Sequence, residues 1–188
     1  GYLMKKNEKS LNGIESKKQI MMAALRLFSQ KGYAMTTIRD ITDAAGTTAP
    51  SLYHHFGNKE GLYRELMAAH FSKIDSIFYS LSNDSESAKN KLKNVVDNVF
   101  LFVMDNRDFF RLMFSIYYGP PQGTPPLDFV DYHIRLHTYI MKTLLEGIRS
   151  KEFKPGNHHA MAWSIRAMLQ LAMNEVVKDD SIRRIDRE

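Results

Sequence analysis

The sequence contains no cysteine. It therefore has no disulfide framework, no thiolate metal site and no thiol redox switch, which fits a reducing cytoplasm. The longest apolar stretch, residues 160–177, is interrupted by Arg166 and Glu175, and charges at that depth argue against a membrane span. The first ten residues also lack the apolar core of a signal peptide. We therefore expect a soluble, cytoplasmic protein with no membrane partner.

The motifs of common enzyme classes are missing as well. The chain has no glycine loop that could cradle a phosphate, no nucleophile elbow, no paired-carboxylate motif and no cysteine nucleophile. Combinations of aspartate and histidine occur, but none has a diagnostic spacing. We therefore expect no catalytic residues, no cofactor and no enzymatic activity.

Acidic residues are scarce in the first third of the chain. Residues 1–60 hold nine Lys or Arg against five Asp or Glu, whereas residues 61–188 hold seventeen against sixteen. The formal net charge of +5 thus comes mostly from the first part. Such an excess is expected where a protein meets phosphate, although a solvated basic terminus would give the same pattern.

Apolar residues recur with helical period along almost the whole chain, and no run of alternating β-branched residues stands out, so we predict an all-α fold. In the segment GPPQGTPP, prolines and glycines exclude a helix. The predicted helices, caps included, cover about residues 16–31, 37–46, 48–56, 58–81, 86–105, 109–118, 127–150 and 157–177.

Two short helices joined by a glycine turn form the most informative segment. Thr37 is the expected N-cap of the first, and Asp40 stands where the acidic partner of a capping box belongs. Gly46 supplies the turn. Thr48 is the expected N-cap of the second helix, and Pro50 fits its first turn, where a missing N–H costs little. This is the layout of a helix-turn-helix, over about residues 37–56.

The second of these helices has one side for packing and one for contacts. Leu52 and Phe56, four residues apart, can anchor it on the core. Small hydroxyls and methyls on the open side can approach base edges. The residues left on the open side or at the helix start are Thr47, Thr48, Ala49, Ser51, Tyr53 and His54.

Phosphate contacts are expected beside these base contacts. The N-termini of the two helices, at Thr37 and Thr48, favour phosphate through their free amides and hydroxyls. The phenol of Tyr53 and the ammonium of Lys59 can reach phosphate too, and Thr36 completes the predicted DNA-binding set. Taken singly, each threonine could equally well be only a helix cap, and Tyr53 only a packing residue, without contacting DNA.

The order of LFSQKGY, TTIRDI, AAG, SLYHHF and NKEGL resembles the TetR family of transcriptional regulators over residues 14–62. The resemblance implies that Thr37, Tyr53 and Lys59 contact phosphates. It also implies that bases are faced by Thr48, Ala49, Ser51 and His54. Pro50 and Ala49 depart from common forms of the motif and reduce its hydrogen-bonding capacity, so shape and water should contribute more to recognition.

We therefore expect a flexible basic arm (1–13), a three-helix helix-turn-helix domain (14–62) and a helical effector-binding and dimerisation domain (63–188). The helix at 157–177 is apolar around most of its circumference, which indicates burial on more than one side. The family resemblance implies a homodimer through the last two long helices. A central core helix in a monomer is the alternative.

Aromatic and methionine side chains are concentrated in the second part of the chain. They suit a pocket for a small apolar or aromatic effector. The candidates are Phe78, Phe100, Phe110, Met113, Phe114, Tyr117 and Trp163. His133 and His137 have a spacing that can chelate a metal, but without a supporting acidic pattern we expect no metal site.

The function expected from the sequence is that of a homodimeric, DNA-binding transcriptional regulator. It would bind a palindromic, double-stranded operator and repress transcription, and a small-molecule effector would release it from the DNA. The alternative is a helical binding protein whose N-terminal domain no longer contacts DNA. An enzyme is the least favoured class.

Overall fold

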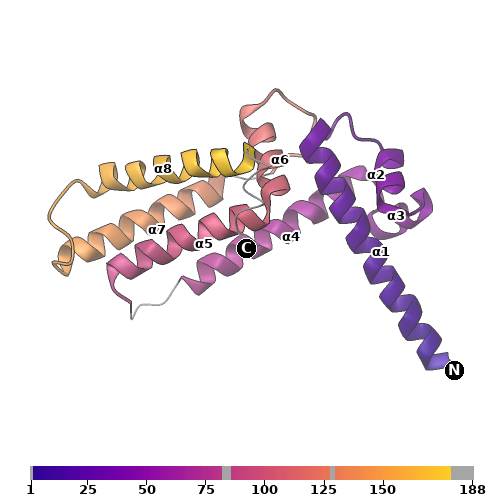
Figure 1. The fold of residues 1–188 in the computed structure, drawn as a ribbon, viewed down its shortest axis with the longest axis horizontal. Coiled ribbons are helices and arrows are strands. Elements are labelled where there is room, and N and C mark those ends of the chain that lie inside the picture. The colour runs from indigo at the N-terminus through magenta and orange to yellow at the C-terminus, as the bar shows by residue number, and fades with distance from the viewer. Residues whose placement is uncertain (1, 82–85, 128–129, 179–188) are drawn as a thin grey trace, which may run out of the picture. The chain divides into compact units, whose positions relative to one another are not determined.

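The structure is a computed structural model of the chain. It describes the backbone of residues 2–81, 86–127 and 130–178 and, within these ranges, the side chains from Asn12 onward except that of Val130. The described residues contain helices and no strands (Figure 1). The helices are α1 (Tyr2–Lys31), α2 (Ile38–Ala45), α3 (Ala49–Phe56), α4 (Lys59–Ser80), α5 (Ala88–Asp105), α6 (Arg107–Tyr118), α7 (Val130–Arg149) and α8 (His158–Lys178). Among them, none combines the length and apolarity that crossing a membrane requires.

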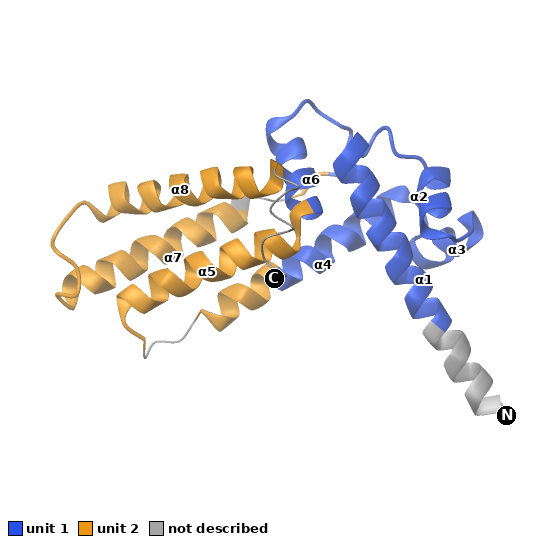
Figure 2. Ribbon diagram, in the orientation of Figure 1, with its two compact units in different colours: residues 1–73, 108–125 blue, residues 74–107, 126–188 orange. Residues whose placement is uncertain are grey.

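The chain divides into two compact units (Figure 2). Unit 1 comprises residues 1–73 and 108–125, and unit 2 comprises residues 74–107 and 126–188. The division falls within α4, after residue 73, and assigns most of α6 and the following loop to unit 1. The boundary predicted at residues 62 and 63 would have placed these segments with the C-terminal part.

Unit 1 is built on the apolar stripe that the sequence shows in α1. Ile20, Ala24 and Phe28 are fully buried in this stripe. The ring of Phe28 lies 5.2 Å from that of Tyr33 and 6.1 Å from that of Tyr63, centroid to centroid. These three side chains join the end of α1 to α4, so α2 and α3 are held on a rigid base.

The loop after α6 is tied to the same unit by a hydrogen bond. The backbone N–H of Tyr33 donates to Gln122 Oε1 at 3.1 Å. Gln122 Nε2 also donates to the backbone oxygen of Ser115. The proline-rich segment is therefore a loop, as predicted, but it is an ordered one that packs on the turn after α1.

Unit 2 is a bundle in which α5, α7 and α8 pack side by side, as Figure 1 shows. Its core contains Leu81, Val95, Ile140, Leu144, Ala162 and Leu169. The N-terminus of α5 is capped by a residue far along the chain. Glu152 accepts hydrogen bonds from the backbone N–H groups of Ala88 at 2.8 Å and Lys89 at 2.9 Å. These bonds lower the pKa of Glu152.

The predicted helices are confirmed, with shifts at several ends. α1 begins at Tyr2, well before the predicted start at Ser16, so that most of the segment predicted as an arm falls within its bounds. The prediction relied on the apolar stripe, and the polar residues before it contain no proline that would stop a helix. α5 begins at Ala88 instead of residue 86, because Ser87 caps it by accepting from Asn90 N at 3.2 Å. α7 is described from Val130, and Leu127, its predicted start, is not in a helix.

Candidate nucleic-acid interface

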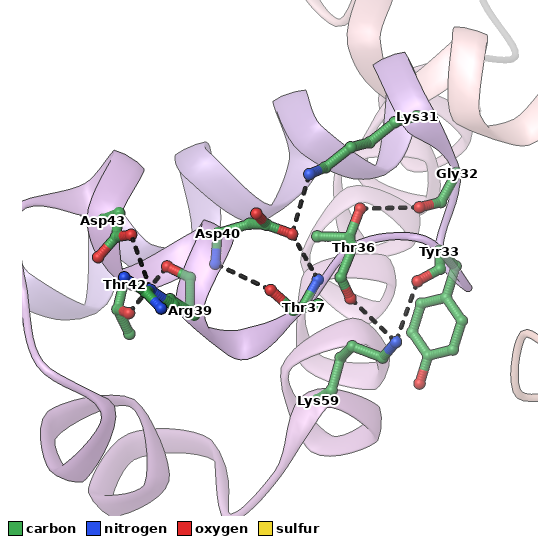
Figure 3. Close-up of polar contacts among 10 residues, drawn as sticks. All are labelled: Lys31, Gly32, Tyr33, Thr36, Thr37, Arg39, Asp40, Thr42, Asp43 and Lys59. Atoms are coloured by element: carbon green, nitrogen blue, oxygen red, sulfur yellow. Dashed lines mark hydrogen bonds and ion pairs between the residues drawn. The ribbon is translucent and has the colours of Figure 1, made fainter.

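The first turn of α2 is closed by a reciprocal pair of hydrogen bonds. The backbone N–H of Asp40 donates to Thr37 Oγ1 at 3.1 Å, and the backbone N–H of Thr37 donates to Asp40 Oδ2 at 2.8 Å (Figure 3). This is the capping box that the sequence predicts. It fixes the start of the first helix of the motif.

Lys31, in the last turn of α1, adds a charge interaction to this cap. Its Nζ lies 2.9 Å from Asp40 Oδ2, as Figure 3 shows. The Lys31 ammonium and the bonds from Thr37 hold the pKa of the Asp40 carboxyl well below its usual range. The pair joins the end of α1 to the start of α2 and is a contact that local sequence pattern does not reveal.

We predict that Asp40→Asn lowers the melting temperature at neutral pH, because asparagine retains an acceptor oxygen but loses the charge paired with Lys31. The native pKa of Asp40 is depressed, so its contribution to stability is present above the pKa of the unfolded state, about 3.9. It is lost as the pH falls through the native pKa. Thermal unfolding of both proteins between pH 7 and pH 2 should therefore show two curves that converge on acidification. A constant difference would contradict this role for the charge.

The turn between α2 and α3 depends on Gly46. Its φ of 62° and ψ of 35° lie in the left-handed region, which glycine adopts without steric cost. The turn is closed by Thr47, whose N–H donates to the Thr42 carbonyl at 3.0 Å. Gly46 therefore sets the angle at which α3 leaves α2.

Replacing Gly46 by alanine is predicted to destabilise the protein by about 1–2 kcal/mol, the cost of a left-handed alanine. No other atom lies within 4 Å of the added Cβ, so steric overlap contributes nothing to this value. Gly13→Ala is the matched control, because Gly13 is helical and its Cβ is equally free. The control should stabilise the protein by about 0.5–1 kcal/mol. Denaturant unfolding measures both; the same sign for the two variants would contradict the prediction.

α3 buries one side and exposes the other. Its N-cap Thr48 accepts from Ser51 N at 3.4 Å, and Pro50 lies in its first turn, as predicted. Leu52 is 0% exposed and Phe56 8%, so both are the anchors that their spacing predicts. Tyr53 is 50% exposed, and Thr48 and His54 are exposed as well. Thr47 and Ala49, at the helix start, are half-buried.

Thr36 does not belong to this exposed surface. Its side chain is 0% exposed, and its hydroxyl donates to the Gly32 carbonyl at 2.7 Å (Figure 3). This side chain is therefore not available to contact DNA, and the prediction that it does so is corrected. Thr36 closes the turn between α1 and α2, a role that its position beside Thr37 conceals in the sequence.

Lys59 connects the start of α4 to that same turn. Its Nζ donates to the carbonyls of Tyr33 and Thr36, each at 3.0 Å, and lies 4.3 Å from the centroid of the Tyr33 ring (Figure 3). Burial lowers the pKa of the ammonium. Since an ammonium has three donors, one remains for a phosphate. Lys59 thus has a structural role that the sequence did not predict.

Ser51 is turned toward α1. Its hydroxyl lies 3.2 Å from that of Ser16, and its side chain is half-buried. This contact occupies the group that was predicted to face bases. The exposed hydroxyls near the start of α3 are therefore fewer than the sequence suggests.

The predicted effector residues fall into both units. Phe110, Met113, Phe114 and Tyr117 belong to unit 1, whereas Phe78, Phe100 and Trp163 belong to unit 2. Tyr117 and Trp163 are 51% and 59% exposed, which does not fit the lining of an enclosed cavity within one chain. The other five are half-buried, and their part in effector binding stays a prediction.

The histidine pair of α7 is engaged with α8. An Arg166 nitrogen lies 3.3 Å from His133 Nδ1, and since the guanidinium can only donate, this imidazole nitrogen is the acceptor. The ring of His137 lies 4.7 Å from that of Trp163. Burial and the nearby Arg166 lower the pKa of both histidines. Within the described ranges, no three His, Cys, Asp or Glu side chains gather as metal ligands do.

Comparison with known proteins agrees with this geometry. Residues 20–66 match the family model described as bacterial regulatory proteins, tetR family. This segment matches the TetR family. The matched residues include the buried stripe of α1, the whole helix-turn-helix and the start of α4.

Several curated relatives are transcriptional regulators. The chain is 29% identical over 108 residues to the HTH-type transcriptional regulator YdgC of Bacillus subtilis, covering 55% of each protein. It is 26% identical over 141 residues to the transcriptional repressor KstR2 of Mycobacterium tuberculosis, covering 73% of this chain and 68% of KstR2. The activator FasR of Mycolicibacterium smegmatis matches at 28% identity over 54% of this chain and 46% of its own length. The chain thus aligns with about half the length of YdgC and FasR.

Solved structures share the fold over most of the chain. PfmR, a TetR-family regulator from Thermus thermophilus, superposes with a TM-score of 0.65 at 22% identity, over 82% of this chain and 83% of its own. AibR, solved in complex with isovaleryl coenzyme A and operator DNA, gives a TM-score of 0.62 at 17% identity, over 87% and 94%. At these identities the similarity establishes the fold: an N-terminal helix-turn-helix followed by a C-terminal helical domain.

Proposed function

We propose that this TetR-family protein binds a palindromic operator as a homodimer and represses transcription until a small molecule releases it. The main support for this proposal is that α3 has a buried side and an exposed side. Leu52 and Phe56 lie on the buried side, and Thr48, Tyr53 and His54 lie on the exposed side. Because its buried side packs on the rest of unit 1, α3 can enter a major groove while that packing stays intact.

Phosphates are bound at the edges of this surface. Both short helices have capped N-termini, at Thr37 and Thr48, where amides and the helix dipole favour an anion. The phenol of Tyr53 and the remaining donor of Lys59 supply side-chain contacts. These groups orient α3 on the duplex and contribute little to the choice of sequence.

Bases are distinguished by a small set of groups. His54 offers ring nitrogens, Thr48 and Thr47 offer hydroxyls, and Ala49 offers a methyl that fits the thymine methyl. Because Pro50 provides no donor and the Ser51 hydroxyl contacts Ser16, direct readout is sparse. DNA shape and bridging water then carry a larger share of the specificity than in a surface rich in Arg or Asn.

Dimerisation brings two such surfaces onto one duplex. α8 buries Ala162 and Leu169 in unit 2, yet its Trp163, Met168 and Leu171 are 59%, 65% and 65% exposed. Ile134 on α7 is 56% exposed too. Apolar residues on both sides of α8 fit a helix that covers its own unit and meets a second copy, which supports a dimer through α7 and α8.

Release by an effector completes the proposal. KstR2 is a repressor by name, and AibR binds both an acyl coenzyme A and operator DNA in its solved complex. A ligand that binds better to a conformer with mismatched recognition helices lowers DNA affinity through that difference alone. The aromatic side chains of the C-terminal part favour an apolar or planar effector.

Selection of bound sequences from random duplex DNA tests the proposal. The purified protein should enrich a palindromic site whose half-sites are about 34–36 Å apart, one turn of the duplex, or a multiple of that distance. Enriched duplexes should bind at least about a thousandfold tighter than scrambled duplexes of the same composition at the same salt concentration. Equal binding to every duplex, with no enriched site, would contradict it.

A further inference from the structure

A groove of about 390 Å³ lies within unit 1, between α1 and the first half of α4. Its apolar lining consists of Ile14, Met21, Met22 and Leu25 from α1 and Leu66 and Ala69 from α4. Ile14 and Met22 are 64% and 58% exposed, so the groove opens to solvent along α1. Its volume is within the range of small-molecule sites, and methionine side chains adapt to flexible ligands.

The charged side chains of the lining are all lysines. Lys17, Lys18, Lys73 and His70 contribute to the groove, and no aspartate or glutamate does. Lys17 forms an ion pair with Glu65. Within the ranges that the structure describes, no carboxylate lies at ion-pair distance from Lys18 or Lys73, and both residues are exposed. Two ammonium groups thus stand unneutralised at an apolar groove.

His70 closes the inner wall. It is 9% exposed, and its ring stacks on Phe109 of α6 at 4.5 Å between centroids and 8° between planes. Its Nδ1 lies 2.8 Å from the Leu66 carbonyl, which can only accept, so Nδ1 is the protonated nitrogen. The imidazole is therefore held rigidly, and burial lowers its pKa. The α4 side of the groove is therefore fixed by His70, whereas the methionines on the α1 side can adapt to a ligand.

We propose that this groove binds an anionic amphiphile, a free long-chain carboxylate whose chain lies on the methionines and leucines and whose head group pairs with Lys18 and Lys73. Opposite charge decides the occupant, because a neutral chain would leave both ammonium groups unpaired and a cationic one would be repelled. The site is distinct from the proposed effector pocket, and the proposal does not depend on DNA binding.

Calorimetric titration of the full chain with dodecanoate, kept below its micellar concentration, tests the site. We expect saturable binding of one dodecanoate per chain and no binding of dodecyltrimethylammonium. In protein labelled with ¹³C-methyl methionine, the signals of Met21 and Met22, assigned by leucine substitution, should shift with the same saturation. Equal binding of the two amphiphiles would overturn the proposal, since it would indicate apolar adsorption alone.

Two variants locate the site. Lys18→Ala with Lys73→Ala removes both free charges and should weaken dodecanoate binding roughly fivefold to thirtyfold, from about 0.5–1 kcal/mol per exposed pair. Ala69→Phe fills the groove without changing the charge and should abolish binding. Lys93→Ala with Lys142→Ala, on exposed positions of unit 2, is the matched control and should leave binding unchanged.

Circular dichroism and thermal unfolding establish that each variant is folded before titration. Unchanged affinity in both groove variants would overturn the proposal. So would adsorption to anionic phospholipid vesicles without saturable binding of dodecanoate, because the groove would then belong to a lipid-surface contact. Since these measurements use no DNA, their failure is distinguishable from failure of the proposed operator binding.

Discussion

A chain with glutamate at both Trp163 and Leu171 is expected to be a monomer and to bind its operator at least about a hundredfold more weakly than the wild type. Both side chains are apolar, and they are 59% and 65% exposed on α8. In a dimer, the new carboxylates would be buried without partners, which is strongly destabilising. A monomer also loses the effective concentration that joins two half-sites and that contributes about 10²–10⁴ to affinity.

Sedimentation velocity gives the oligomeric state and fluorescence anisotropy the DNA affinity. The matched control carries Tyr79→Glu and Leu101→Glu, which add the same charge to unit 2 at side chains that are 86% and 58% exposed on other helices. This control should remain dimeric and bind DNA normally. A dimeric Trp163→Glu, Leu171→Glu variant would show that the interface lies elsewhere.

Leu52→Ala is expected to lower the free energy of unfolding by about 2–5 kcal/mol, the usual cost of removing a buried leucine side chain. Leu52 is 0% exposed and is one of the two residues that anchor α3 on unit 1. The loss of this anchor should also weaken operator binding, because part of the binding energy would be spent on ordering α3.

Chemical denaturation followed by circular dichroism measures the change, and Leu101→Ala is the control. Leu101 is 58% exposed on α5, so the same substitution there should change the free energy of unfolding by no more than about 0.5 kcal/mol. Equal effects at the two positions would contradict the assignment of Leu52 as the anchor of α3.

Local features of the motif were predictable from the sequence. Thr37 with Asp40, Gly46 in the left-handed turn and Thr48 ahead of Pro50 each depend on residues within a few positions. Their signals are conformational preferences and cap chemistry, which act within one turn of a helix. The apolar stripe of α1 and the anchors Leu52 and Phe56 follow from helical period in the same way.

Contacts between distant residues were not predictable. Lys31 with Asp40, Lys59 with the carbonyls after α1 and Ser16 with Ser51 depend on how the helices cross, and no sequence spacing encodes that geometry. Thr36 is the clearest example, because a threonine beside an N-cap has the same signature whether it points to solvent or to a carbonyl. These contacts distinguish the residues with structural roles from those that remain available for the proposed DNA contacts.

The division of the chain also depended on packing. A boundary at the end of the helix-turn-helix follows the family resemblance, but α4 continues without interruption and Phe109 stacks on His70. The stacking connects α6 to α4 through side chains that are far apart in sequence. Only the three-dimensional arrangement reveals that residues 108–125 belong with unit 1.

The central claim, that the exposed side of α3 binds the operator, is tested most directly by the DNA affinity of Tyr53→Phe on the selected duplex. Tyr53 is 50% exposed, so loss of its hydroxyl leaves packing intact and removes the one hydrogen bond to phosphate that we propose for each protomer. At about 1.5 kcal/mol for each of two bonds, affinity should fall roughly a hundredfold. Tyr79→Phe, at a tyrosine that is 86% exposed on α4, should bind like the wild type. If Tyr53→Phe binds the selected duplex as tightly as the wild type, the account of this surface is contradicted.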